Sequence, residues 1–317
     1  MGTPCWSPDG MILAMPLQSE DDKVSTVLLD VGTGNYENPL HQYPRNVLPR
    51  WRYDSRAVAY QATESDGRNS RIAVFDVDTG RETIWAGGQA GLMRPVWLPG
   101  LDLMLLLDPR QELQIPGVDI QQFMHEASES GVIICIGLIS LGENLRTEIY
   151  IVTISQAIKI LPIIKPDSHR YVEWSVEPDR RGRFIAFESN DGGDREIYVL
   201  GRRGLVNVSN HREADWNPRW SPARDMLLFE SFRSGMRGIY RVHPETAHIV
   251  PVATSDVGET WSPSWSPDGN WIAYIGNETG SPQLYLCDSD GTQSALVPSA
   301  PTPVYSPAWR PVRLGDD

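Results

Sequence analysis

Short apolar runs alternate with polar turns along most of this chain, and the alternation is clearest in residues 261–303. There, β-branched and aromatic residues favour strands at 261–265, 271–275, 283–287 and 294–297. The segments between these runs are rich in Gly, Pro, Asp and Ser, which are typical of tight turns because proline presets one backbone angle and glycine tolerates positive φ. The pattern therefore predicts a unit of four short antiparallel strands.

This unit recurs, and a tryptophan marks each copy. Pro-Ser-Trp-Ser-Pro-Asp-Gly at 263–269 is nearly repeated at 4–10 as Pro-Cys-Trp-Ser-Pro-Asp-Gly. Six of the seven marker tryptophans have proline two residues earlier, and only Trp174, which follows Val172 at that distance, does not. Successive markers are 45, 46, 77, 46, 45 and 44 residues apart, a spacing typical of repeat architectures. The markers are Trp6, Trp51, Trp97, Trp174, Trp220, Trp265 and Trp309.

The repeat predicts an all-β fold, a six-bladed β-propeller of four-stranded antiparallel blades that occupies 1–317 as a single domain. Seven markers bound six intervals, and a seventh blade hidden in the 77-residue interval is the alternative. The segment before Trp6 is too short for a full inner strand, so we expect residues 305–309 to complete the first blade. Such closure removes the free strand edges that a ring would otherwise leave.

The long interval predicts one insertion, at 108–147 in the third blade. Candidate strands of this blade lie at 95–97 and 103–107, whereas the aromatic residue of its third strand, Tyr150, comes 53 residues after Trp97. In two other units the corresponding distance is 20 residues. The additional residues are therefore expected between the second and third strands.

Inside this insertion the sequence predicts one helix followed by one strand. Asp119 can cap the helix, with Gln122 as its capping-box partner, and Gly131 can end it. The apolar run 132–139 favours a strand. The helix face follows the i, i+3, i+4, i+7 spacing and consists of Ile120, Phe123, Met124 and Ala127.

Two interpretations of the insertion are open: it packs on its own blade, or it binds a partner. An apolar strand at a blade edge could pair with a strand of another protein. Two further tryptophans, each four residues before a marker, are candidates for a contact at the propeller rim. The candidate partner-binding residues are Ile120, Phe123, Met124, Ile133, Ile134, Ile136, Trp216 and Trp261.

Charge and cysteine usage narrow the classes of partner and compartment. The formal net charge of −13 and a pI near 4.9 argue against a nucleic acid or an anionic membrane surface as the main partner. The three cysteines lie far apart, which weakly favours a reducing compartment. We expect a soluble protein without a membrane span, cytoplasmic because no signal peptide is visible, or periplasmic if a leader has been removed.

No residue pattern predicts catalysis. The chain has no Gly-x-Ser-x-Gly elbow, no phosphate-binding glycine loop and no His-Glu-x-x-His zinc motif. The six histidines are scattered over different units, and the Asp-rich turns lack the spacing of a calcium loop. We therefore expect no catalytic residues, no cofactor and no metal ligands.

The repeat resembles the TolB-type, WD40-like β-propeller repeats of bacteria. The resemblance rests on Pro-x-Trp-Ser-Pro-Asp-Gly, an Ile-Ala-Tyr-like strand, and Glu-Ile-Tyr-Val before a turn such as Asp-x-Asp-Gly, and it covers nearly the whole chain except 108–147. It implies a propeller that serves as a binding platform, as propellers of that family commonly do. TolB itself takes part in a cell-envelope protein assembly, and that particular role is not carried over to this chain. The separate N-terminal α/β domain of TolB has no counterpart in this sequence, so the resemblance concerns the propeller alone.

The sequence thus favours a non-catalytic protein-binding or scaffold propeller, a subunit or accessory of a larger assembly. The alternative is an enzyme of the carbohydrate lyase or hydrolase type, with a pocket over the central channel. Carboxylates or histidines that converge at the channel mouth would favour the enzyme, and an exposed apolar surface would favour the scaffold.

Overall fold

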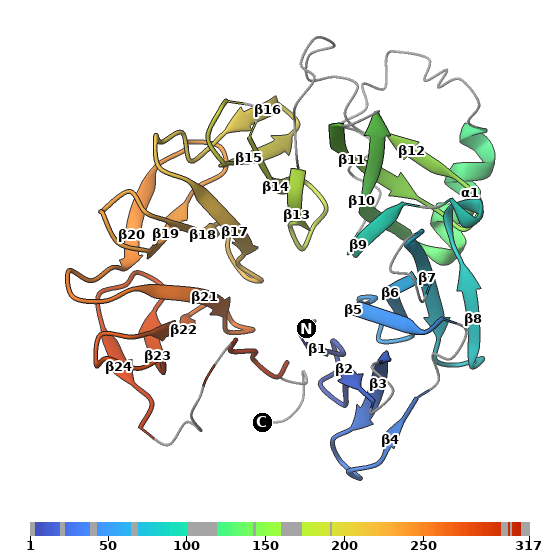
Figure 1. The fold of residues 1–317 in the computed structure, drawn as a ribbon, viewed down its shortest axis with the longest axis horizontal. Coiled ribbons are helices and arrows are strands. Elements are labelled where there is room, and N and C mark those ends of the chain that lie inside the picture. The colour runs from blue at the N-terminus through green and yellow to red at the C-terminus, as the bar shows by residue number, and fades with distance from the viewer. Residues whose placement is uncertain are drawn as a thin grey trace. The chain divides into compact units, whose positions relative to one another are not determined.

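A computed structural model describes residues 4–19, 23–38, 43–64, 69–89, 91–99, 119–141, 144–159, 173–190, 192–298, 304 and 306–311. The chain divides into two compact units, residues 1–170 with 310–317 and residues 171–309 (Figure 1). Within the described ranges, no helix is both long and apolar enough to span a membrane.

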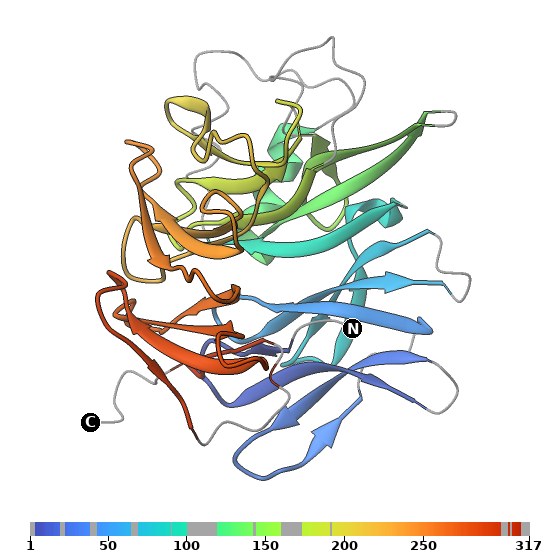
Figure 2. The same cartoon turned by 60° about the vertical axis from the view of Figure 1, so that its left-hand side comes forward.

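The first unit begins with two antiparallel groups of four strands. A parallel pairing of Val24 with Arg45 joins β3 to β5 and so links the two groups into one eight-stranded sheet. Figures 1 and 2 show the strands of this sheet following one another in chain order. The strands are β1 (Cys5–Trp6), β2 (Ile12–Gln18), β3 (Val24–Asp30), β4 (Tyr36–Glu37), β5 (Arg45–Trp51), β6 (Ala57–Thr63), β7 (Arg71–Asp76) and β8 (Arg81–Ile84).

A second sheet completes the first unit and corrects the predicted position of the insertion. Its order is β12-β11-β10-β9, and β10 pairs directly with β9, Val132 opposite Leu98. The apolar run 132–139 is therefore the second strand of this sheet and not an edge strand inside an insertion, because it is hydrogen-bonded on both sides. The strands are β9 (Leu92–Leu98), β10 (Val132–Leu141), β11 (Asn144–Val152) and β12 (Ala157–Lys159).

The excess residues of the long interval consequently lie before the second strand, between β9 and β10, and the predicted boundaries 108–147 are wrong on this point. The run 103–107, which we had expected to be the second strand, lies outside the described residues. The predicted helix is confirmed as α1 (Ile120–Ser130), with the Asp119 side chain accepting a hydrogen bond from the Gln122 amide and Gly131 at its C-cap.

The second unit consists of three four-stranded antiparallel sheets, each with its strands in chain order. Strand β17 contacts both β13 and β21, so these sheets follow one another as neighbours (Figure 1). The strands are β13 (Glu173–Pro178), β14 (Ile185–Ser189), β15 (Glu196–Gly201), β16 (Gly204–Asn207), β17 (Asp215–Trp220), β18 (Leu227–Ser231), β19 (Gly238–Val242), β20 (Ile249–Ala253), β21 (Thr260–Trp265), β22 (Trp271–Gly276), β23 (Gln283–Asp288) and β24 (Ser294–Leu296).

The first strand of five sheets or strand groups carries the same β-bulge, and the bulge explains the repeated proline. In β17, Asn217 and Pro218 together stand opposite one residue of β18, and Asn217 has φ 58°. A proline is tolerated at the second bulge position because no ladder hydrogen bond needs its missing N–H. The residues at the first bulge position all have positive φ and are Leu48, Arg94, Ser175, Asn217 and Ser262.

The same registers correct the assignment of Trp174. Trp174 pairs with Glu188 before the bulge, as Trp216 pairs with Glu230. Pro178, which pairs with Ile185, occupies the position that Trp220 has in the next sheet. Trp174 is therefore the counterpart of Trp216 and Trp261 and not of the marker tryptophans.

The marker tryptophans tie successive sheets together. The indole N–H of Trp97 donates to the Arg50 carbonyl at 3.0 Å, and that of Trp265 donates to the Arg219 carbonyl at 3.2 Å. Each accepting carbonyl belongs to the first strand of the preceding sheet or strand group, so each indole satisfies a polar group of its neighbour. The same bond joins Trp51 to Cys5, Trp220 to Glu177 and Trp309 to Ser264.

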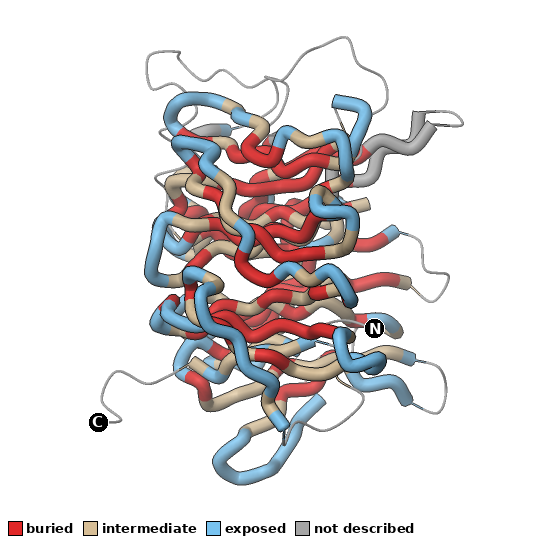
Figure 3. Tube along the Cα trace, turned by 90° about the vertical axis from the view of Figure 1, so that its left-hand side faces the viewer, coloured by how far each residue is buried: buried red, intermediate tan, exposed pale blue. Residues whose placement is uncertain are grey.

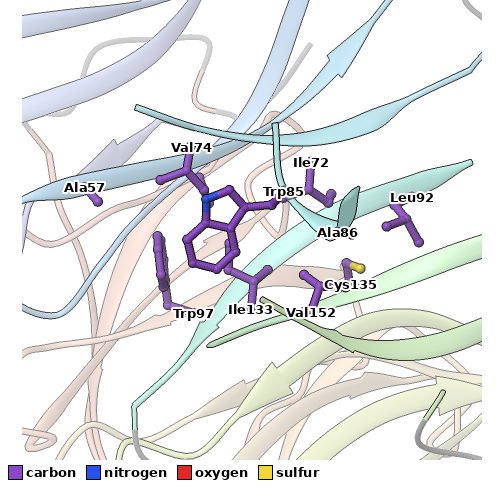
Figure 4. Packing of buried hydrophobic residues seen from close by; sticks show 11 residues of the cluster. Ala57, Ile72, Val74, Trp85, Ala86, Leu92, Trp97, Ile133, Cys135 and Val152 are labelled. Carbon is purple, nitrogen blue, oxygen red and sulfur yellow. The ribbon is translucent and has the colours of Figure 1, made fainter. Parts of the chain in front are cut away.

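Apolar side chains of adjacent sheets interlock around these indoles. In the first unit, Trp97 packs with Trp85 edge to face at 5.4 Å, in a buried cluster that also contains Ile72 and Ile133 (Figure 4). In the second unit, Trp265 packs on Leu228 and Ile239 of the preceding sheet. Figure 3 shows buried residues concentrated along the strands and exposed residues in the turns.

The C-terminal residues contact other parts of the chain without forming a strand in the described segment 306–311. The expected strand at 305–309 is therefore not present as such, although Trp309 makes the marker bond to Ser264 at 3.0 Å. Arg310 donates to the Gly10 carbonyl at 2.9 Å and lies over the Trp6 ring at 5.7 Å.

Candidate functional site

Two tryptophan side chains flank one arginine in the second unit, and a phenylalanine packs against one of the tryptophans. The Arg237 guanidinium lies 5.3 Å from the Trp216 ring and 5.7 Å from the Trp261 ring, distances that suit cation–π contacts. Phe232 packs against Trp216 with ring centroids 5.2 Å apart. We call Trp216, Phe232, Arg237 and Trp261 the aromatic–arginine cluster.

Strand topology explains why these residues meet. Trp216 and Trp261 lie near the starts of the first strands β17 and β21, immediately before their bulges. Phe232 and Arg237 lie in the β18–β19 turn, which reaches the same end of the sheet because β18 runs antiparallel to β17. The cluster is accessible, since Phe232 is 37% exposed and the two indoles are half-buried.

The buried carboxylate of Glu230 holds the cluster in place. Arg237 Nε donates to Glu230 Oε2 at 2.6 Å. Oε1 of the same carboxylate accepts from the Asn217 side-chain amide at 2.5 Å and from the backbone N–H of Ser262 at 3.0 Å. Glu230 is fully buried, so these donors are needed to offset the cost of removing its charge from water. Arg237 is thereby fixed between the two indoles.

A related arrangement occurs one sheet earlier. Arg195 Nε donates to Glu188 Oε2 at 2.7 Å, and Glu188 Oε1 accepts from the backbone N–H of Asn217 at 2.6 Å. In the first unit, Gln61 Oε1 accepts from the N–H of Arg94, again the first bulge residue of the following sheet. A polar second-strand side chain thus bonds the bulge of the next sheet in each case.

This pattern has a sequence signal that the search for catalytic motifs missed. Phe-Glu-Ser occurs at 187–189 and at 229–231, and each Glu is followed seven residues later by Arg. A Glu in the middle of an apolar strand demands a paired cation when it is buried. The signal could therefore have identified Glu230 and Arg237 beside Trp216.

Further buried carboxyls lie next to the cluster. Asp215, which precedes Trp216, is fully buried and bonds Arg233 Nη2 at 3.0 Å. Burial raises the pKa of nearby Glu196 to about 7, against the opposing effect of hydrogen bonds from the Ser209 hydroxyl and the His211 amide, and the Asp215 charge raises it further. These groups form a polar network in which Asp215 precedes Trp216 and is bonded to Arg233, while Glu196 is bonded to Ser209 and His211.

The predicted partner-binding residues of the insertion are placed differently from the expectation. Ile133, Ile134 and Ile136 are at most 2% exposed, because β10 is covered on both edges and both faces. Phe123 is also fully buried. A partner has no access to these four side chains, so the expectation of a partner contact at them is corrected here.

Two other predicted residues lie on helix α1. Met124 is half-buried, and the side chain of Ile120 is outside the described part of the structure. The helix packs on its own sheet, since Glu126 accepts hydrogen bonds from Thr153 and Ser155. Its C-terminal end also contacts the preceding strand group, because the Ser130 carbonyl accepts a hydrogen bond from Arg52, which follows β5. Of the predicted residues, Trp216 and Trp261 are partly exposed and meet around Arg237.

No grouping of three or more His, Cys, Asp or Glu side chains suited to a metal ion occurs among the residues that the structure describes. The cysteines Cys135 and Cys287 are buried. Burial raises the pKa of Cys287 to about 12, so its thiol is protonated at neutral pH.

Comparison with known proteins supports the predicted resemblance. No family model matches the chain. A TolB homologue of Chlorobaculum tepidum is 30% identical over 113 residues, which are 35% of this chain and 26% of that protein. The Tol-Pal system protein TolB of Desulfotalea psychrophila is 29% identical over 104 residues, 32% of this chain and 24% of that protein. The chain thus resembles TolB, and the matches span about a quarter of these relatives.

Solved structures show the fold. The β-propeller domain of the Trilobed protease from Pyrococcus furiosus matches with a TM-score of 0.62 and 13% identity over 93% of this chain and 82% of that one. TolB from Acinetobacter baumannii matches with a TM-score of 0.56 and 17% identity over 90% and 63%. An oligogalacturonate lyase in complex with manganese matches with a TM-score of 0.63 and 15% identity over 92% and 74%. The predicted all-β, propeller-like fold is confirmed.

Proposed function

We propose that this chain is a non-catalytic β-propeller of six blades that binds a protein partner through the aromatic–arginine cluster, as a subunit or accessory of a larger assembly. The observation that carries the proposal is the position of Arg237 between two partly exposed indoles, with Phe232 beside them. Trp, Arg and other aromatic residues dominate the binding energy of protein interfaces.

The cluster is suited to binding because it is already ordered. Arg237 would otherwise lose side-chain freedom on association, but Glu230 and the two rings already hold it. The rings offer flat apolar surface held in place by an arginine that is already paired with Glu230, which suits a partner segment that presents an apolar or aromatic side chain. The protein in the Tol-Pal system that resembles this chain supports an assembly role in general terms.

The proposed six blades rest on the strand grouping in the two units. The first unit has two four-strand groups and one four-stranded sheet, and the second unit has three four-stranded sheets. The seven-bladed alternative requires four further strands between β9 and β13. Residues 119–159 of that segment supply the helix α1 and strands β10–β12 of the existing sheet, which favours six.

A photo-crosslinking experiment tests the binding proposal. p-Benzoylphenylalanine is placed at Phe232 in one variant and at Trp271 in a matched control. Trp271 is also exposed, at 46%, but it lies at the far end of β22 from the cluster, since Trp261 pairs with Ile275 near the other end of that strand. Each protein is exposed to an extract of the source organism, and crosslinked partners are identified by mass spectrometry. We expect a defined partner from position 232 and none of it from position 271.

Substitution of the cluster then measures its contribution. The Phe232→Ala/Trp261→Ala variant should lower recovery of that partner by about tenfold or more, the loss typical of interface hot spots. Trp271→Ala should leave recovery unchanged. Arg237→Ala is a poorer choice, because it removes the ion-pair partner of buried Glu230. Equal crosslinking from both positions would contradict the proposed surface, and turnover of an offered oligosaccharide would favour the lyase or hydrolase alternative.

A further inference from the structure

A pocket of about 340 Å³ lies at the other end of the strands from the aromatic–arginine cluster. It is formed between the β15–β16 hairpin of one sheet and the β19–β20 turn of the next sheet, with the residues that precede β14. This volume is at the lower end of the range for small-molecule sites. The pocket belongs entirely to the second unit.

The walls of the pocket are largely apolar and well packed. Phe184 stacks on Trp220 with ring centroids 5.8 Å apart, and its ring lies so close to Gly201 that a Cβ there would be 2.7 Å from it. Val199 is buried, whereas Val206 is 40% exposed at the opening. The absence of a side chain at Gly201 therefore lets an aromatic ring form one wall.

Two arginines stand at the opening with no protein partner within the described part of the chain. Gly201 pairs with Gly204, so Arg202 and Arg203 are the two loop residues of a tight hairpin, and both are exposed. Gly204 has φ +91°, which glycine adopts without strain. The hairpin thus presents two adjacent guanidinium groups to an apolar pocket.

The other charges around the pocket are largely paired. Arg183 is bonded to Asp179 at 3.2 Å and also to Asp225, so its charge is neutralised locally. Glu245 is the remaining lining carboxylate. Among the residues that line the pocket, three arginines face one carboxylate, and Arg202 and Arg203 are the arginines without an ion-pair partner in the described ranges, in a chain whose formal net charge is −13.

We propose that this pocket binds a small organic anion, one aromatic or branched apolar group that carries a carboxylate, sulfonate or phosphate. The apolar group would contact Phe184, Val199 and Val206, and the anion would accept hydrogen bonds from Arg202 and Arg203. Guanidinium groups bind such anions in a bidentate, charge-assisted way. The proposal is independent of the protein-binding surface, because the two sites share no residue.

Two fluorescent probes that differ in charge test the proposal. 1-Anilinonaphthalene-8-sulfonate carries the anion, and N-phenyl-1-naphthylamine has the same rings without it. We expect the sulfonate to bind the folded protein with a one-to-one stoichiometry and about tenfold more tightly than the neutral probe. Its affinity should fall when NaCl is raised from about 50 to about 300 mM, while that of the neutral probe should not.

Three variants locate the binding. The Arg202→Glu/Arg203→Glu variant should bind the sulfonate about tenfold or more less tightly, and its affinity for the neutral probe should stay within about twofold of that of the natural protein. Val206→Trp, which fills the opening, should lower the affinity of the protein for both probes. Arg212→Glu is the matched control, and it should change the affinity of neither probe. Arg212 is exposed, does not line the pocket and lies just before β17, at the strand end that carries the aromatic–arginine cluster.

Thermal unfolding monitors whether each variant is folded, and Arg202→Gln/Arg203→Gln replaces the charge reversal if that variant is not. Equal affinities of the two probes for the natural protein would overturn the proposal. It would also be overturned by an unchanged sulfonate affinity in the arginine variants, by an unchanged affinity in Val206→Trp, or by no binding of the sulfonate at all.

Discussion

At the residue scale, the marker tryptophans join neighbouring sheets, because each indole combines a large apolar ring with one N–H donor. Trp265 is 7% exposed, packs on Leu228 and Ile239 of the preceding sheet and donates its indole N–H to the Arg219 carbonyl. The ring buries a large apolar area, and the hydrogen bond leaves neither polar group unsatisfied. This combination explains why tryptophan occupies the position in most repeats. In the exceptional repeat the position is held by Pro178, which has no side-chain N–H to donate.

Replacement of this residue gives the first stability prediction. Trp265→Ala should lower the free energy of unfolding by about 3–5 kcal/mol, the usual cost of truncating a buried aromatic side chain. The control is Trp271→Ala in the next strand, where the ring is 46% exposed and a loss of no more than about 1 kcal/mol is expected. Urea unfolding followed by circular dichroism measures both, and equal losses would show that the repeat position has no special packing role.

At the element scale, helix α1 belongs to its own sheet and is not a free interaction arm. The Glu126 carboxylate accepts from the Thr153 and Ser155 hydroxyls, each at 2.6 Å, and both residues lie between β11 and β12. On the other side of the helix, its C-terminal end lies against Trp97, since a Cβ on Gly131 would be 3.1 Å from that ring. Helix α1 therefore adds Phe123 and Ala127 to the buried core of the first unit.

The Glu126 bonds predict a pH dependence. Burial opposes ionisation, but the hydrogen bonds from Ser155 and Thr153 outweigh it and lower the pKa of Glu126 from 4.5 to about 2. A carboxyl whose pKa is lowered on folding stabilises the folded state above pH 4.5, and this contribution is lost as pH falls towards 2. Glu126→Gln should therefore be less stable than the natural protein at pH 6.

The difference between the two proteins should shrink steadily between about pH 4.5 and about pH 2. Glu129→Gln is the matched control, because Glu129 lies on the same helix and is exposed. Thermal unfolding across this pH range measures the effect. A constant difference at all pH values would mean that Glu126 acts through its shape and not through its charge.

At the scale of the whole molecule, the C-terminal residues make contacts in each of the two units. In the second unit Trp309 bonds Ser264, and in the first unit Arg310 bonds Gly10, 300 residues earlier, and lies over Trp6. Contacts of large sequence separation form late and stabilise the folded chain against local opening.

Removal of this segment is predicted to destabilise the protein. Truncation before residue 303 should lower the midpoint of thermal unfolding by several degrees, and Trp309→Ala alone should cost about 1–3 kcal/mol. Truncation after residue 311 keeps Trp309 and Arg310 and serves as the control, for which no change is expected. An unchanged midpoint after the longer truncation would contradict the proposed role of the C-terminus.

The amino-acid sequence by itself determined the local features of the fold, which depend only on residues close together along the chain. The four strands of 260–296 and helix α1 with its Asp119 cap follow from residue type and spacing and lie where the pattern predicts, whereas the expected strand at 305–309 does not form in the described residues 306–309. The repeat interval likewise indicated the propeller-like fold. Tertiary structure alone decided how distant segments pair: β10 joins β9 across the long interval, and this pairing buries Ile133, Ile134 and Ile136.

The same physical reason explains the site. In the observed register, Trp174 lies at the position of Trp216 and Trp261, a few residues away from the marker position that the repeat predicted for it. Arg237 reaches the two indoles only because antiparallel pairing brings a turn and two strand starts together. Local propensity contains no information on such pairings, since they depend on which apolar faces pack best across the whole unit.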